Sequence, residues 1–246
     1  MSGATPVLHL IAGPNGAGKS TLYRYLIQPR YPDLVFVNAD VHEREALQHI
    51  DNPLKRSEAA RAWADAQRAD FLARGGSFVS ETVFSHPSKL DLIQEAQGLG
   101  FEVALYVVCV SDPRRLLRRV RQRVQEGGHD VPGNKILERY PRTVANLTQA
   151  VRMANLSMLF DAVETDDGGP MLVASVTRNG ITRHVQPLPA WAVRCWRRRH
   201  TERRRPAFFQ TIKASISEAL TGTPRVISSQ PVAVTMASSS MRIPML

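Results

Sequence analysis

One octapeptide near the start of the chain constrains its fold more than any other feature. Gly13–Ser20, with the sequence GPNGAGKS, matches the pattern G-x-x-x-x-G-K-[ST] at every fixed position. The apolar run Val7–Ala12 precedes it, and apolar residues at helical spacing follow it. In this strand–loop–helix context, backbone N–H groups converge on phosphates, and the helix N-terminus adds the positive end of its dipole. The sequence therefore predicts a phosphate-binding loop rather than a chance glycine-rich turn.

The residues of this loop have separate expected roles in holding a nucleotide. The Lys19 ammonium is expected to reach the β- and γ-phosphates, and the Ser20 hydroxyl is expected to ligate Mg²⁺. The predicted nucleotide-binding residues are Gly13, Pro14, Asn15, Gly16, Ala17, Gly18, Lys19, Ser20 and Thr21.

Short apolar runs alternate with helical patterns along most of the chain. We expect buried strands at Val7–Ala12, Leu34–Val37, Ser77–Ser80 and Val103–Val110. Helices are expected after Ser20, over Ser57–Arg74, over Pro87–Gln97, from Asp112–Pro113 to Gly127–Gly128, and from about Asn134 to Met153. This alternation is typical of βαβ units. It predicts an α/β fold of the P-loop NTPase type, with a doubly wound and mainly parallel sheet.

A β-hairpin is expected after this alternating pattern. Asn179-Gly180 lies between the β-rich runs Met171–Val176 and Ile181–Val185. Because Asn-Gly favours the two-residue turns that join antiparallel strands, we place a hairpin at the edge of the sheet.

Charge is distributed unevenly along the chain. The net charge is +10, but residues 191–246 hold ten basic and two acidic side chains, whereas residues 1–190 hold 22 and 20. Apolar periodicity also fails beyond Pro189. We therefore expect one domain over residues 1–189 and a basic, largely disordered tail over residues 190–246. Only this tail is expected to contact nucleic acid.

Composition disfavours several classes of protein. No stretch approaches ~18 uninterrupted apolar residues, so no contact with a membrane is expected. Met1–Thr5 carries no basic segment ahead of an apolar run, so no signal peptide is expected. The two cysteines, Cys109 and Cys195, cannot form a disulfide framework. These features predict a cytoplasmic protein.

Two large classes of P-loop protein lack their further motifs here. Transporter-type ATPases carry an LSGGQ-like signature and a strand that ends in Asp-Glu, and neither occurs in the sequence. GTPases carry N-K-x-D after a strand, whereas Asn134–Leu137 lacks the aspartate and opens a helical pattern. Both classes are therefore disfavoured.

Carboxylates follow two of the expected strands. Asp40 comes directly after the second strand, and Glu81 and Thr82 come directly after the third. Catalytic groups gather at the carboxyl ends of parallel strands. A carboxylate at that edge could accept the proton of an alcohol as it attacks a phosphoryl group. The alternatives are an N-cap role for Asp40 and a structural hydrogen-bonding role for Glu81.

Arginines crowd a segment that contains two adjacent glycines. They are Arg118, Arg119, Arg121, Arg123, Arg139 and Arg142, and they flank Gly127-Gly128 on both sides. Such a segment, over about residues 112–146, predicts a lid that closes over a nucleotide and supplies guanidinium groups to the developing phosphate charge. The alternatives are that most of these arginines are solvated and that His129 between them is structural.

Together, these segments resemble the zeta-toxin family of P-loop kinases, in particular its short bacterial members. The resemblance runs from about Val7 to Val185 and rests on four blocks: GPNGAGKST, VNAD, FVSETVFSHPSKL and RVRQRVQEGGHDVPGNKILERYPRTVANL. It implies a kinase-like α/β core that binds ATP with Mg²⁺. The best known zeta toxins phosphorylate a hydroxyl of UDP-N-acetylglucosamine.

The resemblance also implies residue roles by motif position. Lys19 and Ser20 would be the phosphate and Mg²⁺ residues, and Asp40 would be the general base. Glu81 and Thr82 would contact the substrate.

For the lid, Arg123 and Arg139 are our choices as catalytic arginines, with Arg119 and Arg142 as the alternatives. The sequence thus predicts an ATP-dependent phosphotransferase that acts on a hydroxyl of a small molecule, such as a nucleotide sugar, and the resemblance suggests an antitoxin protein as a partner. Two other functions stay open. One is a polynucleotide kinase whose basic tail holds phosphates, and the other is an ATP-dependent switch that changes the conformation of a partner.

Overall fold

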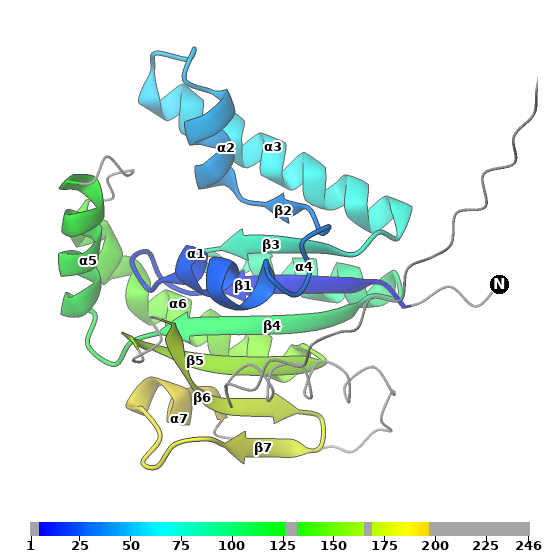
Figure 1. Cartoon of the computed structure of the whole chain (residues 1–246), viewed down its shortest axis with the longest axis vertical. Coiled ribbons are helices and arrows are strands. Elements are labelled where there is room, and N and C mark those ends of the chain that lie inside the picture. Colours follow the sequence, from blue (N-terminus) through cyan, green and yellow to red (C-terminus); the bar gives the residue numbers. More distant parts are fainter. Residues whose placement is uncertain (1–4, 126–131, 165–168, 197–246) are drawn as a thin grey trace, which may run out of the picture. The chain divides into compact units, whose positions relative to one another are not determined.

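The computed structural model describes residues 5–125, 132–164 and 169–196. They form a seven-stranded sheet in the order β2-β3-β1-β4-β5-β6-β7 (Figure 1). Strands β2 to β5 pair in parallel, and β6 and β7 are antiparallel to their neighbours. The predicted α/β fold with a mainly parallel sheet is confirmed. The strands are β1 (Val7–Ala12), β2 (Phe36–Val37), β3 (Phe78–Thr82), β4 (Glu102–Cys109), β5 (Leu156–Glu164), β6 (Pro170–Thr177) and β7 (Gly180–Arg183).

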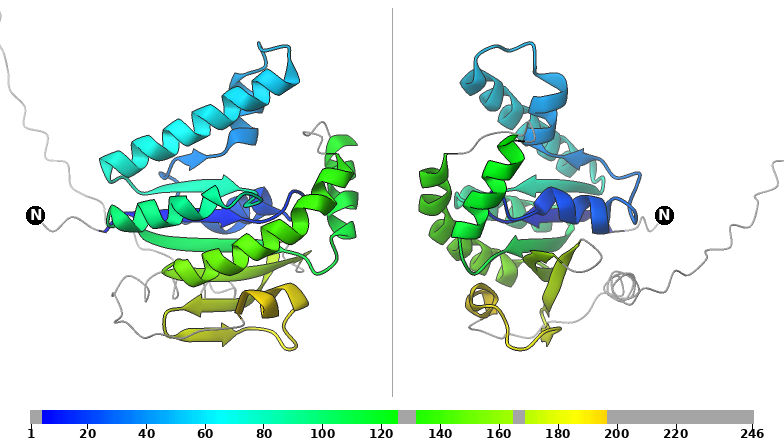
Figure 2. Two further views of the ribbon diagram at one scale, coloured as in Figure 1. Left: turned by 180° about the vertical axis from the view of Figure 1, so that it is seen from behind. Right: turned by 60° about the vertical axis from the view of Figure 1, so that its left-hand side comes forward.

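Helices cover both faces of this sheet. They are α1 (Lys19–Leu22), which continues into the π-helical segment η1 (Tyr23–Ile27), α2 (Ala39–Ala46), α3 (Pro53–Arg74), α4 (Ser88–Gly98), α5 (Arg114–Gln125), α6 (Gly133–Met153) and α7 (Ala190–Trp196). The segments α1 and η1 lie on one face, and α3, α4, α6 and α7 lie on the other (Figure 2). The sheet is therefore doubly wound, as predicted. Within the described ranges, no helix has the length and apolar character needed to cross a membrane.

The two central strands are buried along their whole length. Every residue of β1 and of β4 is buried, because helices or neighbouring strands cover them on all sides. The register between β1 and β3 pairs Ile11 with Glu81 and Ala12 with Thr82. The carboxyl end of β3 therefore lies directly beside the start of the glycine-rich loop.

Strand β5 was not among the strands expected from the sequence. It pairs in parallel with β4 and antiparallel with β6. Polar residues interrupt its apolar pattern, yet they are buried and bonded: Ser157 Oγ donates to the Val151 carbonyl at 3.4 Å, and Asp161 Oδ1 accepts from the Val163 N–H at 3.1 Å. The interruption removed the continuous apolar run by which the other buried strands were predicted.

Helix α7 extends the packed domain beyond the C-terminal boundary that we expected from the sequence. Trp191, Ala192 and Cys195 are all buried, and Trp191 Nε1 donates to Asp161 Oδ2 at 3.1 Å. The domain therefore continues beyond residue 189, where we expected it to end, at least through α7. Apolar residues at 191, 192 and 195 are spaced as one face of a short helix, and this pattern was overlooked beside the arginines that follow. The expected disordered tail beyond residue 196 lies outside the described residues.

The hairpin and the helices of the predicted lid are present. Strands β6 and β7 pair through Val176 with Ile181 and through Thr177 with Gly180. Helix α5 begins after Asp112, whose Oδ1 accepts from the Arg114 N–H at 2.9 Å, and α6 follows as expected. The glycine loop between α5 and α6, with Gly127, Gly128 and His129, lies outside the described residues.

Candidate active site

The glycine-rich loop runs between β1 and α1 and packs closely on its neighbours. A Cβ at Gly13 would lie 2.1 Å from the carbonyl oxygen of Val108 on β4. Gly16 has a φ of +79°, and a Cβ there would lie 2.9 Å from the Leu116 carbonyl oxygen on α5. Both positions therefore require glycine, because a side chain would collide with backbone atoms. The loop is fixed against both the sheet and α5.

Lys19 is the first residue of α1 and is buried within the loop. Its Nζ donates to the Pro14 carbonyl oxygen at 3.3 Å and lies 3.5 Å from Glu81 Oε1. The side chain thus spans the loop from its helical end to its start. The ammonium is held at the position where the motif requires a phosphate-binding charge.

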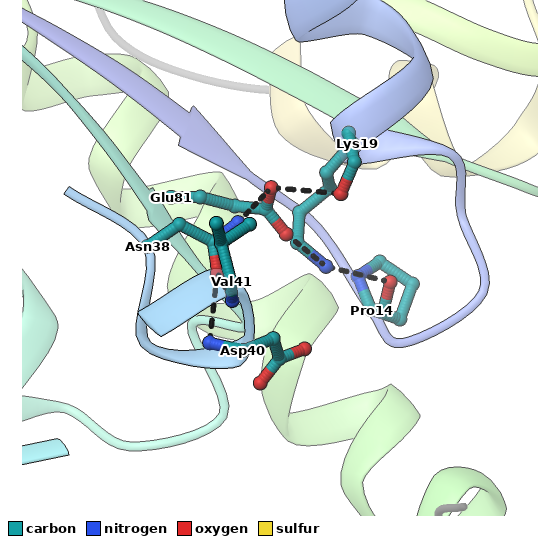
Figure 3. A network of polar contacts seen from close by, with 7 residues as sticks. Pro14, Lys19, Asn38, Asp40, Val41 and Glu81 are labelled. Atoms are coloured by element: carbon teal, nitrogen blue, oxygen red, sulfur yellow. Dashed lines mark hydrogen bonds and ion pairs between the residues drawn. The ribbon is translucent and has the colours of Figure 1, made fainter. Parts of the chain in front are cut away.

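Glu81, at the end of β3, is the centre of a polar network (Figure 3). Its Oε1 pairs with Lys19, and its Oε2 accepts from Ser20 Oγ at 3.1 Å and from Asn38 Nδ2 at 2.9 Å. The carboxylate side chain is 9% exposed. Three donors compensate for the burial of this charge. In this structure Glu81 faces the loop residues, so its predicted contact with a substrate stays a prediction.

Asp40 is the second residue of α2, and the N-cap of that helix is Asn38. The Asn38 Oδ1 accepts from the backbone N–H of Asp40 at 2.9 Å and of Val41 at 3.2 Å. The alternative in which Asp40 is the cap is therefore wrong. Asp40 is exposed, and its carboxylate points away from Glu81 (Figure 3). It is free to meet a molecule that enters beside the loop.

The structure distinguishes among the arginines of α5 and α6. Arg119 lies beside the loop, because a Cβ at Gly18 would be 3.8 Å from its Nη1, and its Nη2 donates to the Ala162 carbonyl oxygen. Arg142 is exposed and pairs with Glu138 at 2.7 Å on the surface of α6. Arg119 is thus held next to the loop, whereas Arg142 lies on the surface of α6.

The structure says less about Arg123 and Arg139, our two choices for the catalytic lid arginines. Arg123 belongs to α5, but its side chain lies outside what the structure describes. Arg139 is half-buried on α6. Arg118 and Arg121 are exposed on α5, as the alternative of solvated arginines expects.

Sequence reasoning missed a strained residue next to this network. Phe84, in the segment after β3, has a φ of +62° although its ring is buried. Bulky residues rarely adopt such a backbone conformation, which occurs mostly where the surroundings enforce it. Asn146 on α6 is buried and donates its Nδ2 to the Phe84 carbonyl oxygen at 3.0 Å. The segment that follows Glu81 and Thr82 is therefore anchored to α6.

The fold and the loop together define a class of protein. A complete phosphate loop after the central strand of a β2-β3-β1-β4-β5 parallel sheet is the arrangement of a P-loop nucleotide-binding domain. The family model described as an AAA domain matches residues 8–147, which is more than half of the chain. This protein therefore belongs to the AAA domain family. No curated protein matches it.

Solved structures share this fold at low sequence identity. A chain of the AvrRxo1-ORF1 and -ORF2 complex with ATP is 18% identical, with a TM-score of 0.61 over 89% of this chain and 74% of that chain. A chain of the PezAT chromosomal toxin-antitoxin system of Streptococcus pneumoniae is 14% identical, with a TM-score of 0.55 over 88% of this chain and 86% of that chain. The expected zeta-toxin-like P-loop fold is confirmed at the level of the fold.

Proposed function

We propose that this protein is an ATP-dependent kinase that transfers the γ-phosphate of ATP to a hydroxyl of a small molecule. The observation that carries the proposal is the exposed Asp40 carboxylate, which follows β2 at the same edge of the sheet as the phosphate loop. Transfer to an alcohol needs a group that receives the alcohol's proton, and the phosphate loop itself supplies no such group. Asp40 supplies such a group, and the cap role that could explain it otherwise belongs to Asn38.

In the proposed reaction, the acceptor oxygen attacks the γ-phosphorus while the bond from that phosphorus to the bridging oxygen of ADP breaks. Asp40 takes the hydroxyl proton. Lys19 neutralises negative charge on the phosphoryl oxygens, together with the lid arginines, for which we propose Arg123 and Arg139. Before it can do so, Lys19 must exchange its contact with Glu81 for one with phosphate. The Glu81 carboxylate therefore holds the ammonium in place until the nucleotide arrives.

Mg²⁺ fits the oxygen donors of the site. Ser20 Oγ and Glu81 Oε2 lie 3.1 Å apart, and hydroxyl and carboxylate oxygens are ligands that Mg²⁺ prefers, along with phosphate oxygens. In the described ranges no group of three or more His, Cys, Asp or Glu side chains could hold a metal ion. Ser20 would ligate Mg²⁺ directly, and Glu81 would orient the Ser20 hydroxyl. When bound, Mg²⁺ would neutralise charge on the β- and γ-phosphates.

For the acceptor, we propose a sugar hydroxyl, with UDP-N-acetylglucosamine as the first candidate. The support is the resemblance of four sequence blocks to zeta toxins, together with the fold shared with the PezAT chain. Glu81 and Thr82 are the proposed substrate contacts, at the end of β3 and on the same sheet edge as Asp40.

We also propose an antitoxin-type protein partner and a cytoplasmic location. The partner proposal is supported by two neighbours in fold, one from a toxin-antitoxin system and one from a two-component complex. Such a partner should inhibit phosphoryl transfer when it is added to the purified protein.

The test follows γ-labelled phosphate from ATP in the presence of Mg²⁺ and purified full-length protein. Three reactions are compared: one with UDP-N-acetylglucosamine, one with a DNA oligonucleotide that has free hydroxyl ends, and one without an acceptor. We expect label on the nucleotide sugar. Label on the oligonucleotide would favour a polynucleotide kinase, and equal ATP turnover without an acceptor would favour a switch. A cell extract analysed by mass spectrometry extends the search to other acceptors.

The variant Asp40→Asn tests the proposed base. It should lower the rate of transfer by about 10²- to 10⁴-fold, with ATP affinity within a few-fold of wild type. The unfolding temperature should fall by no more than about 4 °C, because Asn38 keeps the cap of α2 and only the Asp40 charge in the first turn is lost. Asp51→Asn, at an exposed carboxylate outside the site, is the matched control. Wild-type turnover in Asp40→Asn would transfer the base role to Glu81.

A further inference from the structure

The side chain of Asn38 connects the two halves of the proposed active site. One half is α2, which carries Asp40, and the other is the phosphate loop with Lys19 and Ser20. The Asn38 Oδ1 holds the first turn of α2 through two backbone N–H groups, and its Nδ2 donates to Glu81 Oε2 at 2.9 Å. Glu81 in turn contacts Lys19 and Ser20 (Figure 3).

We propose that Asn38 is a positioning residue that fixes the Asp40 carboxylate relative to the phosphate loop by acting through Glu81. The proposal rests on the proposed function, because it assigns Asp40 a role in phosphoryl transfer. Asn38 itself is 4% exposed, so it acts through its neighbours rather than by meeting a substrate directly. Its three hydrogen bonds use both ends of the amide, and a buried amide with both ends bonded has one orientation.

The short β2 makes this connection important for the placement of α2. Strand β2 contains only Phe36 and Val37, which pair with Val79 and Ser80 of β3. Asn38 is the next residue and already caps α2. Two residues of strand pairing leave the direction of the following helix weakly determined. The body of α2 is held against α3, where His42 stacks on Trp63 and Glu43 pairs with Arg56. The bond from Asn38 to Glu81 adds a constraint at the other end, because it ties the first turn of α2 to the phosphate loop.

Asn52 provides an internal comparison. It caps α3 with the same pair of bonds, from the N–H groups of Leu54 at 3.0 Å and Lys55 at 3.1 Å. It is exposed, and its amide nitrogen has no partner among the residues that the structure describes. Asn52 therefore has the capping role alone, whereas Asn38 has the cap and the bond to Glu81.

The test replaces the donor of Asn38 and keeps its capping oxygen. Aspartate caps helices as well as asparagine does, but Asn38→Asp places an oxygen where the N–H group faced the Glu81 carboxylate. We expect kcat to fall about 10- to 100-fold, because small misplacements of catalytic groups have effects of this size. The unfolding temperature should also fall, because the new carboxylate is buried beside that of Glu81 and like charges repel there. The neutral variant Asn38→Ser separates the loss of the bond from this repulsion. Asn52→Asp, the matched control, should leave kcat unchanged.

A double-mutant cycle shows whether Asn38 acts through Glu81. Asn38→Ser keeps a capping oxygen but is too short to reach Glu81, and it should also lower kcat. In the Glu81→Ala background, the same change should have no further effect, because the partner is already absent. Additive losses would overturn the proposal. So would a kcat for Asn38→Asp within twofold of wild type.

Hydrogen exchange tests the connection without any phosphate acceptor. Glu81→Ala leaves the cap of Asn38 intact but removes the carboxylate that it donates to. We expect amide exchange in residues 39–46 to speed up several-fold, while exchange in residues 53–74 stays as in wild type. Unchanged exchange in 39–46 would overturn the proposal. If exchange responds but wild-type protein phosphorylates no acceptor, Asn38 still positions α2 and the proposed function is the part that fails.

Discussion

The packing of α7 makes a prediction about stability that can be worked out from one side chain. Trp191 is 2% exposed, and its indole N–H bonds the buried carboxylate of Asp161. Replacing a buried tryptophan with alanine costs about 3–5 kcal/mol in the free energy of unfolding. Leaving the Asp161 oxygen without that donor adds about 1 kcal/mol or more. In domains of this size, each kcal/mol lost from the free energy of unfolding lowers the unfolding temperature by about 2–4 °C. Trp191→Ala should therefore lower the unfolding temperature by roughly 10–20 °C.

Thermal unfolding followed by circular dichroism is the assay, with urea unfolding to measure the free energy. Trp63→Ala is the matched control, because Trp63 is only half-buried and stacks on His42 with ring centroids 3.8 Å apart. Its effect should be less than half as large. A chain that ends at residue 189 should also unfold well below one that ends at residue 206. An unfolding temperature for Trp191→Ala within about 3 °C of wild type would refute the reasoning.

Three further predictions concern the site and the core beneath it. Lys19→Ala should abolish phosphoryl transfer from γ-labelled ATP and weaken ATP binding in calorimetry, with an unchanged circular dichroism spectrum. Arg119→Gln should slow transfer more than Arg142→Gln, because Arg119 lies beside Gly18 and Arg142 lies on the surface. Burial lowers the pKa of His9 to about 4, against about 6.5 in the unfolded chain. As the pH falls from about 6.5 towards 4, the unfolded state therefore takes up a proton before the folded state does. The free energy of unfolding, measured by urea unfolding, should decrease over that range, and the decrease should be smaller in His9→Gln.

The sequence was sufficient for those parts of the fold that depend on local pattern. Val7–Ala12 and the loop after it could be predicted because a continuous apolar run and a complete motif lie side by side. Strand β5 could not, because Ser157 and Asp161 break its apolar run and find their partners only in the folded protein. Helix α7 is a different case, because its apolar face at residues 191, 192 and 195 is present in the sequence and was overlooked beside the arginines that follow it.

The site shows the same division between local and long-range information. Asp40 could be placed at the sheet edge from its position after a strand. The contact between Asn38 and Glu81 joins residues that are 43 positions apart, and it depends on how β3 pairs with its neighbours. The position of Arg119 beside the loop likewise depends on how α5 packs on Gly16. No spacing in the sequence encodes that packing.

The close contact of Gly16 with Leu116 and Val120 determines where α5 can bend. A Cβ at Gly16 would lie 2.9 Å from the Leu116 carbonyl oxygen and 3.0 Å from a Val120 methyl group, so there is no slack between the loop and this part of the helix. We therefore expect the first two turns of α5 to stay packed on the phosphate loop in any rearrangement of the lid. Any hinge that brings later arginines toward a nucleotide has to lie beyond Val120. Arg119 precedes Val120 and would stay beside the loop in such a motion, whereas Arg123 follows Val120.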